Sequence, residues 1–210
     1  MFQPYVEQGL LQIVGSEPGK SLVERVDPIS YIEKLKTPKL IIAGANDPYW
    51  AIDAATIYYH DLQEPKAILY APNSGHDLED RKRVLNTLAV FCRMCAQGKT
   101  MPKVRGEVGK ATVPTPLGAE PDPTRPESAD LSLYTSGAEQ IRFWWANSAS
   151  RNFTLSTWQV FAEKIEPVQF AASLPGTGKP GFRAAFGEAE FVHDGIRYYL
   201  SSLPAILGGR

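Results

Sequence analysis

The first half of the chain alternates between amphipathic stretches and continuously apolar ones. Residues 39–47 and 66–75 each begin as an apolar run, which is typical of a parallel strand covered by helices on both faces. Residues 28–36, 51–62 and 79–97 carry helical signals, such as an Asp-Pro start or apolar residues along one face. The order helix, strand, helix, strand, helix predicts a parallel α/β sheet.

The C-terminal third follows a strand pattern instead. Residues 138–210 are dominated by aromatic and β-branched residues, and the Asp194-Gly195 pair is a strong hairpin signal. This pattern predicts a small β-sandwich-like module of short strands. Between the two parts, residues 98–137 contain six prolines and are typical of a connector, while segment 103–113 also fits the first strand of the module.

Composition and charge narrow the classes of function. The 210 residues are 43% hydrophobic and 21% charged, which argues against disorder and suits one large domain or two small ones. The net charge is −1, so nothing indicates binding to nucleic acid, and no apolar run is long enough for a transmembrane segment. Cys92 and Cys95 fall late in an apolar helix without a second ligand pair, and we expect neither a metal ion nor a cofactor.

The candidate chemistry is an acid and a histidine, each of which follows one of the two predicted parallel strands. Asp47 ends the first strand region and His76 the second. Neighbouring parallel strands place their C-terminal loops side by side, so these side chains can meet. A carboxylate fixes the tautomer of an imidazole, which then takes a proton from a nucleophile. We predict Asp47 as the catalytic acid and His76 as the catalytic base, although a strand that ends in Asp and a loop His occur in many α/β folds.

Three short stretches carry a resemblance to a known family. They are Val26-Asp27-Pro28 with Tyr31, Pro38-Lys39-Leu40 with Asn46-Asp47, and Pro72-Asn73 with Gly75-His76. In these stretches the chain resembles the PhoPQ-activated pathogenicity-related protein family. The resemblance is specific over residues 26–80, and a looser resemblance extends over residues 138–210. The resemblance implies an α/β-hydrolase-like fold, a β-rich C-terminal module, and a secreted or cell-envelope location. The family usually has an acidic residue, an aromatic residue and an arginine in succession in the first of its C-terminal strands. This chain has Asn152-Phe153-Thr154 there and so departs from the family pattern.

A hydrolase also needs a nucleophile on a G-x-S-x-G elbow, and the sequence has none. A hydrolase sheet has about eight strands, of which only the last two or three are encoded here. We therefore predict that residues 1–97 are the C-terminal part of an α/β-hydrolase-like domain, 98–137 a Pro-rich connector and 138–210 the β-rich module. Met1 is then an internal methionine of a longer chain or the start of a truncated reading frame.

Two classes of function remain open at this point. In the first, the chain is a C-terminal fragment of a serine-hydrolase-like protein, whose N-terminal hydrolase portion supplies the nucleophile for a small-molecule ester, amide or peptide substrate. In the second, the chain is a non-catalytic secreted protein that binds a partner or a glycan through the β-rich module. Trp144, Trp145 and Trp158 fit a sugar-stacking platform, but aromatic residues also dominate small β cores.

Overall fold

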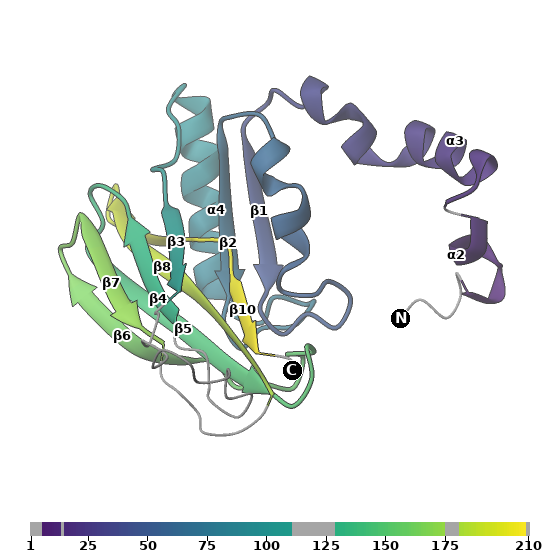
Figure 1. The fold of residues 1–210 in the computed structure, drawn as a ribbon. Helices are drawn as coiled ribbons and strands as arrows, with labels where there is room; N and C mark the ends of the chain where they lie inside the picture. The colour runs from purple at the N-terminus through teal and green to yellow at the C-terminus, as the bar shows by residue number, and fades with distance from the viewer. Residues whose placement is uncertain (1–5, 14, 111–128, 175–180, 209–210) are drawn as a thin grey trace.

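The computed structural model describes residues 6–13, 15–110, 129–174 and 181–208 (Figure 1). It combines helices with three sheets, whose strands are mostly antiparallel. None of the helices in these ranges is long and apolar enough to cross a membrane. The helices are α2 (Leu10–Ile13), α3 (Glu17–Val26), the 3-10 helices η1 (Pro28–Lys34), η2 (Ala54–Ile57) and η3 (Tyr59–Asp61), and α4 (Arg81–Ala96).

The strands form one parallel pair and two antiparallel sheets. The pair is β1 with β2, the first antiparallel sheet has the order β10-β8-β5-β6 with β9 also on β8, and the second has the order β3-β4-β7. The strands are β1 (Lys39–Gly44), β2 (Lys66–Ala71), β3 (Arg105–Lys110), β4 (Ala129–Tyr134), β5 (Gln140–Ser148), β6 (Gln159–Ile165), β7 (Gln169–Ser173), β8 (Phe182–His193), β9 (Ile196–Ser201) and β10 (Ala205–Gly208).

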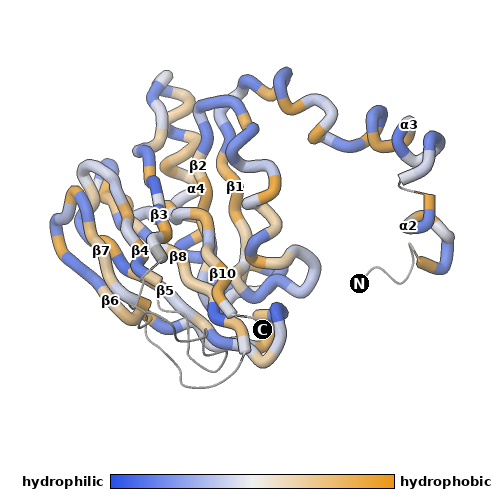
Figure 2. Tube along the Cα trace, viewed as in Figure 1, coloured by the Kyte–Doolittle hydropathy of each residue, from blue (hydrophilic) through white to orange (hydrophobic). Residues whose placement is uncertain are grey.

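The parallel pair and its helix agree with the sequence prediction. β1 and β2 run in register from Lys39 opposite Lys66 to Gly44 opposite Ala71, and Figure 2 shows both as apolar stretches. β2 is buried over nearly its whole length, because α4 and β9 lie against it. β1 is only half-buried, and within the described ranges no strand pairs with its second edge.

The long strand β8 organises the antiparallel part. Its first half pairs with β10, its second half pairs with β9, and β5 pairs along nearly its whole length. The turn between β8 and β9 has positive φ values at Asp194 (50°) and Gly195 (75°). Two successive residues with positive φ define the type I′ turn, which matches the twist of antiparallel strands, and the predicted hairpin is confirmed.

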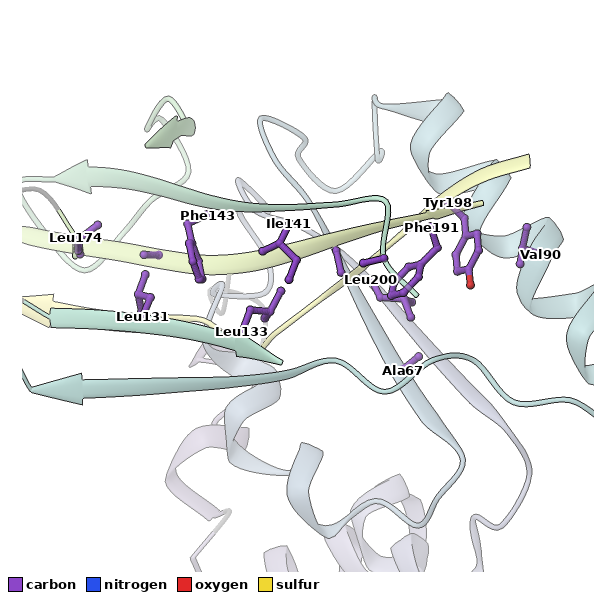
Figure 3. Close-up of a cluster of buried hydrophobic side chains, with 13 residues drawn as sticks. Ala67, Val90, Leu131, Leu133, Ile141, Phe143, Leu174, Phe191, Tyr198 and Leu200 are labelled. Carbon is purple, nitrogen blue, oxygen red and sulfur yellow. The ribbon is translucent and has the colours of Figure 1, made fainter. Parts of the chain in front are cut away.

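Two clusters of buried apolar side chains hold these parts together. The first lies between the antiparallel sheets and reaches β2 and α4 through Ala67 and Val90 (Figure 3). The second joins the loops that follow β1 to the five-stranded sheet, with Tyr70 packed on Phe186 and Phe186 on Trp158. The parallel pair and the antiparallel sheets therefore share their core.

Two predicted helices have a tighter geometry than expected. Ile29, Ile32 and Leu35 recur every third residue, which is the period of a 3-10 helix, and the segment forms η1. The predicted helix at 51–62 is instead the two short helices η2 and η3. Its β-branched and aromatic residues have low helix propensity, which is consistent with this break.

The predicted connector contains strands. β3 and β4 both lie within residues 98–137, and β3 falls in segment 103–113, the alternative first strand of the module. Neither strand contains a proline, so both can donate backbone hydrogen bonds to a ladder. Prolines 114 to 126 of the predicted connector lie outside the described residues.

A buried ion-pair network links α4 to the five-stranded sheet. Glu188 of β8 is completely buried, and its carboxylate accepts hydrogen bonds from Arg83 of α4 and Arg142 of β5. Burial raises the pKa of Glu188, and the facing guanidinium groups oppose that shift. Arg83 also stacks on the ring of Tyr199, with 4.2 Å between the guanidinium carbon and the ring centroid.

This network predicts a marked loss of stability for Arg83→Met. The variant leaves the Glu188 carboxylate buried with Arg142 as its main counter-charge, so the free energy of unfolding should fall by about 3 kcal/mol. Urea denaturation followed by tryptophan fluorescence measures the change. Lys82→Met is the matched control, because Lys82 is exposed beside Arg83 and should shift stability by less than about 0.5 kcal/mol. Equal effects in the two variants would contradict the prediction.

Candidate active site

The ends of β1 and β2 place two loops side by side. The loop after β1 carries Asp47 and the loop after β2 carries His76. The backbone N–H of Ala45 donates to Ala71 (2.9 Å), and that of Asn46 donates to Ser74 (2.9 Å). The parallel ladder thus continues past both strands and brings the two loops together.

Gly44 makes this close passage possible. A Cβ atom at this position would lie 2.1 Å from the carbonyl oxygen of Gly75 and 2.4 Å from that of Ser74. Both distances are far below van der Waals contact, and both neighbours are backbone atoms that cannot rotate away. A residue without a side chain is therefore required at the end of β1.

The structure brings Asp47 and His76 into direct contact. Nδ1 of His76 lies 2.9 Å from Oδ2 of Asp47. The other carboxylate oxygen, Oδ1, accepts the backbone N–H groups of Tyr49 (2.7 Å) and Trp50 (3.1 Å). The Asp47 side chain is 6% exposed and the imidazole 53% exposed, so the carboxylate lies beneath a ring that faces solvent.

These hydrogen bonds determine the charge of the carboxylate. Burial works against the ionised form of Asp47, but hydrogen bonds from His76 and from the N–H groups of Tyr49 and Trp50 outweigh it. The pKa of Asp47 is therefore lowered below its ordinary value. An ionised carboxylate at this position orients the imidazole with its Nδ1–H toward Asp47 and leaves Nε2 available to a reactant.

The loop that carries His76 is held by the start of α4. The N–H of Gly75 donates to the carboxylate of Glu79 (2.7 Å), and the N–H of Asp80 donates to the hydroxyl of Ser74 (3.1 Å). Asp80 in turn caps α4 by accepting the N–H of Arg83. Glu79 and Asp80 therefore stabilise the loop and the first turn of the helix. In the described part of the chain, no group of three or more His, Cys, Asp or Glu side chains could hold a metal ion.

A nucleophile is not found next to the imidazole. In the ranges that the structure describes, the hydrogen-bond partner of His76 is Asp47, and no serine, threonine or cysteine side chain bonds to its ring. Ser74 is buried and bonded to the backbone of Asp80. The arrangement can therefore orient a base, but it does not contain the group from which that base would take a proton.

The other histidines and the two cysteines do not bond to this pair in the described residues. His60 is exposed, and the side chain of His193, which precedes the turn between β8 and β9, is 19% exposed. Cys92 and Cys95 are free thiols on α4. Trp158 is buried, which supports the interpretation of this residue as core.

Some contacts of the site were not predicted from the sequence. The ring of Tyr49 meets the imidazole edge to face, with 4.7 Å between the ring centroids. Asn46 and Asn73, noted only as part of the family resemblance, hydrogen-bond to the chain between β5 and β6. Their position beside the predicted acid and base was the signal that could have identified them.

Comparison with known proteins identifies the family of this chain. The model of the PhoPQ-activated pathogenicity-related proteins matches residues 1–154. The chain belongs to this family. The matched region of this PhoPQ-related chain includes both Asp47 and His76, together with β1, β2 and α4.

Other comparisons add little to the family assignment. No curated protein matches this PhoPQ-related chain. One solved structure, described as the X-ray structure of Northeast Structural Genomics Consortium target SoR45, is 11% identical, with a TM-score of 0.28. The similarity covers 51% of the PhoPQ-related chain and 86% of that structure.

The tight passage at the end of β1 predicts the effect of Gly44→Ala. The new methyl group forces the loops apart, and we expect the free energy of unfolding to fall by about 3 kcal/mol. Chemical denaturation measures this loss. Gly75→Ala is the matched control, because its Cβ would approach nothing closer than 3.4 Å, an oxygen of the flexible Glu79 side chain. A stability loss as large in the control as in Gly44→Ala would contradict this account of Gly44.

The hydrogen bonds of Asp47 predict a measurable titration. In ¹³C NMR of carboxyl-labelled aspartate, the Asp47 signal should titrate below the ordinary aspartate range. His76→Gln removes the ring hydrogen bond and should raise the Asp47 pKa, whereas His60→Gln should leave it unchanged.

The same shift has a consequence for stability. Because the folded-state pKa of Asp47 is lowered, its ionised form stabilises the fold above the pKa of an unfolded aspartate, and this contribution is lost as pH falls through the folded-state pKa. Asp47→Asn should therefore destabilise the protein at neutral pH and lose this effect in strong acid. An identical pH dependence of stability in the variant and the natural chain would refute the assignment.

Proposed function

We propose that this chain is the C-terminal part of a serine-hydrolase-like protein, in which Asp47 and His76 act as acid and base for a nucleophile supplied from outside the chain. The observation that carries the proposal is the 2.9 Å contact between a nearly buried, ionised Asp47 and a solvent-facing His76 at the ends of adjacent parallel strands. Membership of the PhoPQ-activated pathogenicity-related family is consistent with it.

The geometry suits general base catalysis. Asp47 accepts the Nδ1–H of His76, so Nε2 is the ring nitrogen that takes the proton of an attacking hydroxyl and returns it to the leaving group. The imidazolium that forms in between is stabilised by the negative charge of Asp47. The backbone donors of Tyr49 and Trp50 keep that carboxylate charged and fixed in orientation.

The open edge of β1 supports an external nucleophile. Within the described ranges β1 pairs only with β2, and its side chains are half-buried. Further parallel strands on this edge would bring their own C-terminal loops to the same side of the sheet as Asp47 and His76. An elbow at the end of such a strand is where a hydrolase carries its serine. The substrate class is that of this chemistry, an ester, an amide or a peptide bond.

Exposed apolar side chains on α3 support the same view. α3 extends away from the sheets in Figure 1, and Leu22 and Val26 on it are exposed (49% and 66%). Such side chains are normally covered by a neighbouring element. The N-terminal hydrolase portion is the element that we propose to cover them.

The alternative, a non-catalytic protein that binds through the β-rich module, has less support. Trp158 is in the core, and Trp144 is half-buried and donates to the buried Glu188. Trp145 packs against the first cluster. The indole rings are therefore used mainly for packing rather than displayed together as a flat platform.

The deciding experiment begins with the gene upstream of the Met1 codon. If the frame stays open and encodes a strand, G-x-S-x-G and a helix, the protein of the whole frame should hydrolyse a p-nitrophenyl ester. In that protein we expect Asp47→Asn to lower kcat by about 10⁴-fold and His76→Gln to do at least as much. His60→Gln is the control and should leave the rate unchanged.

The chain by itself gives the complementary measurement. Without a nucleophile it should show no serine-type ester hydrolysis and should not be labelled by a fluorophosphonate probe. A His76-dependent esterase rate from the purified 210-residue chain would show that the nucleophile is internal and refute that part of the proposal. A whole frame without an elbow and without hydrolysis would leave the binding function as the better explanation.

A further inference from the structure

The chain between β5 and β6, residues 149–158, contacts both loops of the candidate site, and we call it the β5–β6 segment. It belongs to the antiparallel part of the fold and lies about a hundred residues from the loops in sequence. No pattern in the segment itself predicts a role in the site.

On the acid side, the contact is made by the residue next to Asp47. The side-chain amide of Asn46 donates to the carbonyl oxygens of Phe153 (3.0 Å), Thr154 (3.1 Å) and Ser156 (2.6 Å). Its backbone N–H donates to Ser74 in the loop of His76 (2.9 Å). Asn46 is thus bonded to the β5–β6 segment and to the base loop while it is covalently joined to the acid.

On the base side, Asn73 makes a reciprocal pair of bonds with one residue of the segment. Its Oδ1 accepts the N–H of Trp158 (2.8 Å), and its Nδ2 donates to the carbonyl of the same residue (3.0 Å). Asn73 has a φ of 54°, a left-handed conformation in which the chain turns toward His76. The amide therefore holds the point at which the base loop changes direction.

The segment is itself firmly placed. Phe153 and Trp158, near its middle and at its end, are 4% and 2% exposed and pack on each other in the second cluster. Arg151 forms an ion pair with Asp53 (2.5 Å), in the chain that follows Asp47. A segment anchored in this way can fix the distance between the two loops to which it is hydrogen-bonded.

We propose that the β5–β6 segment positions the acid–base pair, and that Asn46 and Asn73 are the positioning residues through which it acts. The inference rests on the proposed function, since it concerns the geometry of Asp47 and His76. Within the described residues, neither asparagine side chain hydrogen-bonds to the imidazole or to the Asp47 carboxylate. Each bonds instead to the β5–β6 segment from the loop that carries one partner. Loss of either amide leaves both functional side chains present but lets their loops move relative to each other.

The test uses the purified chain and two substitutions that remove only an amide. Asn46→Ala deletes the three bonds on the acid side. Asn73→Gly deletes the pair on the base side, and glycine adopts a φ of 54° without strain. Asn86→Ala is the matched control, because the amide of Asn86 donates to the carbonyl of Arg197 (3.0 Å) and so joins α4 to the antiparallel part away from the pair.

Two NMR signals report on the pair rather than on the fold. One is the Nδ1 proton of His76 in ¹⁵N-labelled protein, assigned with His76→Gln among the three histidines. The other is the pKa of the Asp47 carboxyl, assigned with Asp47→Asn. In Asn46→Ala and Asn73→Gly we expect the proton signal to be lost to exchange with water and the Asp47 pKa to rise toward that of an unperturbed aspartate. Asn86→Ala should lower the stability and leave both signals as in the natural chain.

The outcomes separate the two proposals. If the natural chain shows the proton signal and a lowered Asp47 pKa, but both amide variants retain them, the positioning inference is overturned and the acid–base pair stands. If the natural chain itself lacks them and His76→Gln has no effect on Asp47, the acid–base pair fails, and the inference fails with it. Asn73→Gly decides alone if Asn46→Ala does not fold.

Discussion

The burial of β2 between two different neighbours is the constraint on which the rest of the structure depends. Its alternate side chains enter both clusters, Ala67 the first and Ile68 and Tyr70 the second. One backbone edge pairs with β1, and on the other edge the N–H of Tyr70 donates to the hydroxyl of Ser201 at the end of β9 (3.0 Å). Through this strand, the start of the His76 loop is fixed relative to the antiparallel sheets.

The two loops of the candidate site are held in place by elements that pack around β2. β2 fixes the start of the His76 loop, Gly44 lets the Asp47 loop pass against it, and α4 holds the loop from its far end. α4 is in turn held by the Arg83 and Glu188 pair and by Val90 in the first cluster. The 2.9 Å contact between His76 and Asp47 therefore depends on several residues that do not themselves hydrogen-bond to either side chain.

Much of this could be predicted from local patterns. The two parallel strands, α4 and the β8–β9 hairpin follow from apolar runs and one Asp-Gly pair, and these signals need no knowledge of the distant chain. The meeting of Asp47 with His76 follows from a topological rule, because adjacent parallel strands end on the same side. Their role in chemistry is a proposal that the pattern and the geometry both support.

The features that could not be predicted depend on contacts distant in sequence or on small differences in period. A helix with an apolar residue at every third position differs from an α-helix by little more than half a residue per turn, so η1 was expected as α-helical. Strand β4 was not predicted, because it lies in a stretch whose many prolines indicated a connector, whereas β3 falls in segment 103–113, which was the alternative first strand of the module. Asn46 is bonded to a residue 107 positions away, and Asn73 to one 85 positions away, and polar loop residues carry no periodic signal of such partners. The sequence pattern of β8 likewise does not indicate which arginines bind its buried Glu188.

The long separation of Asn46 and Asn73 from their partners also sets an order of events during synthesis. A ribosome releases both loops of the site well before residues 153–158 exist, and β8, which pairs along β5 and packs Phe186 on Trp158, comes later still. While the chain is being made, acid and base are therefore present without the segment that holds their loops. The bonds that join the β5–β6 segment to both loops can form only after the last third of the polypeptide has been synthesised.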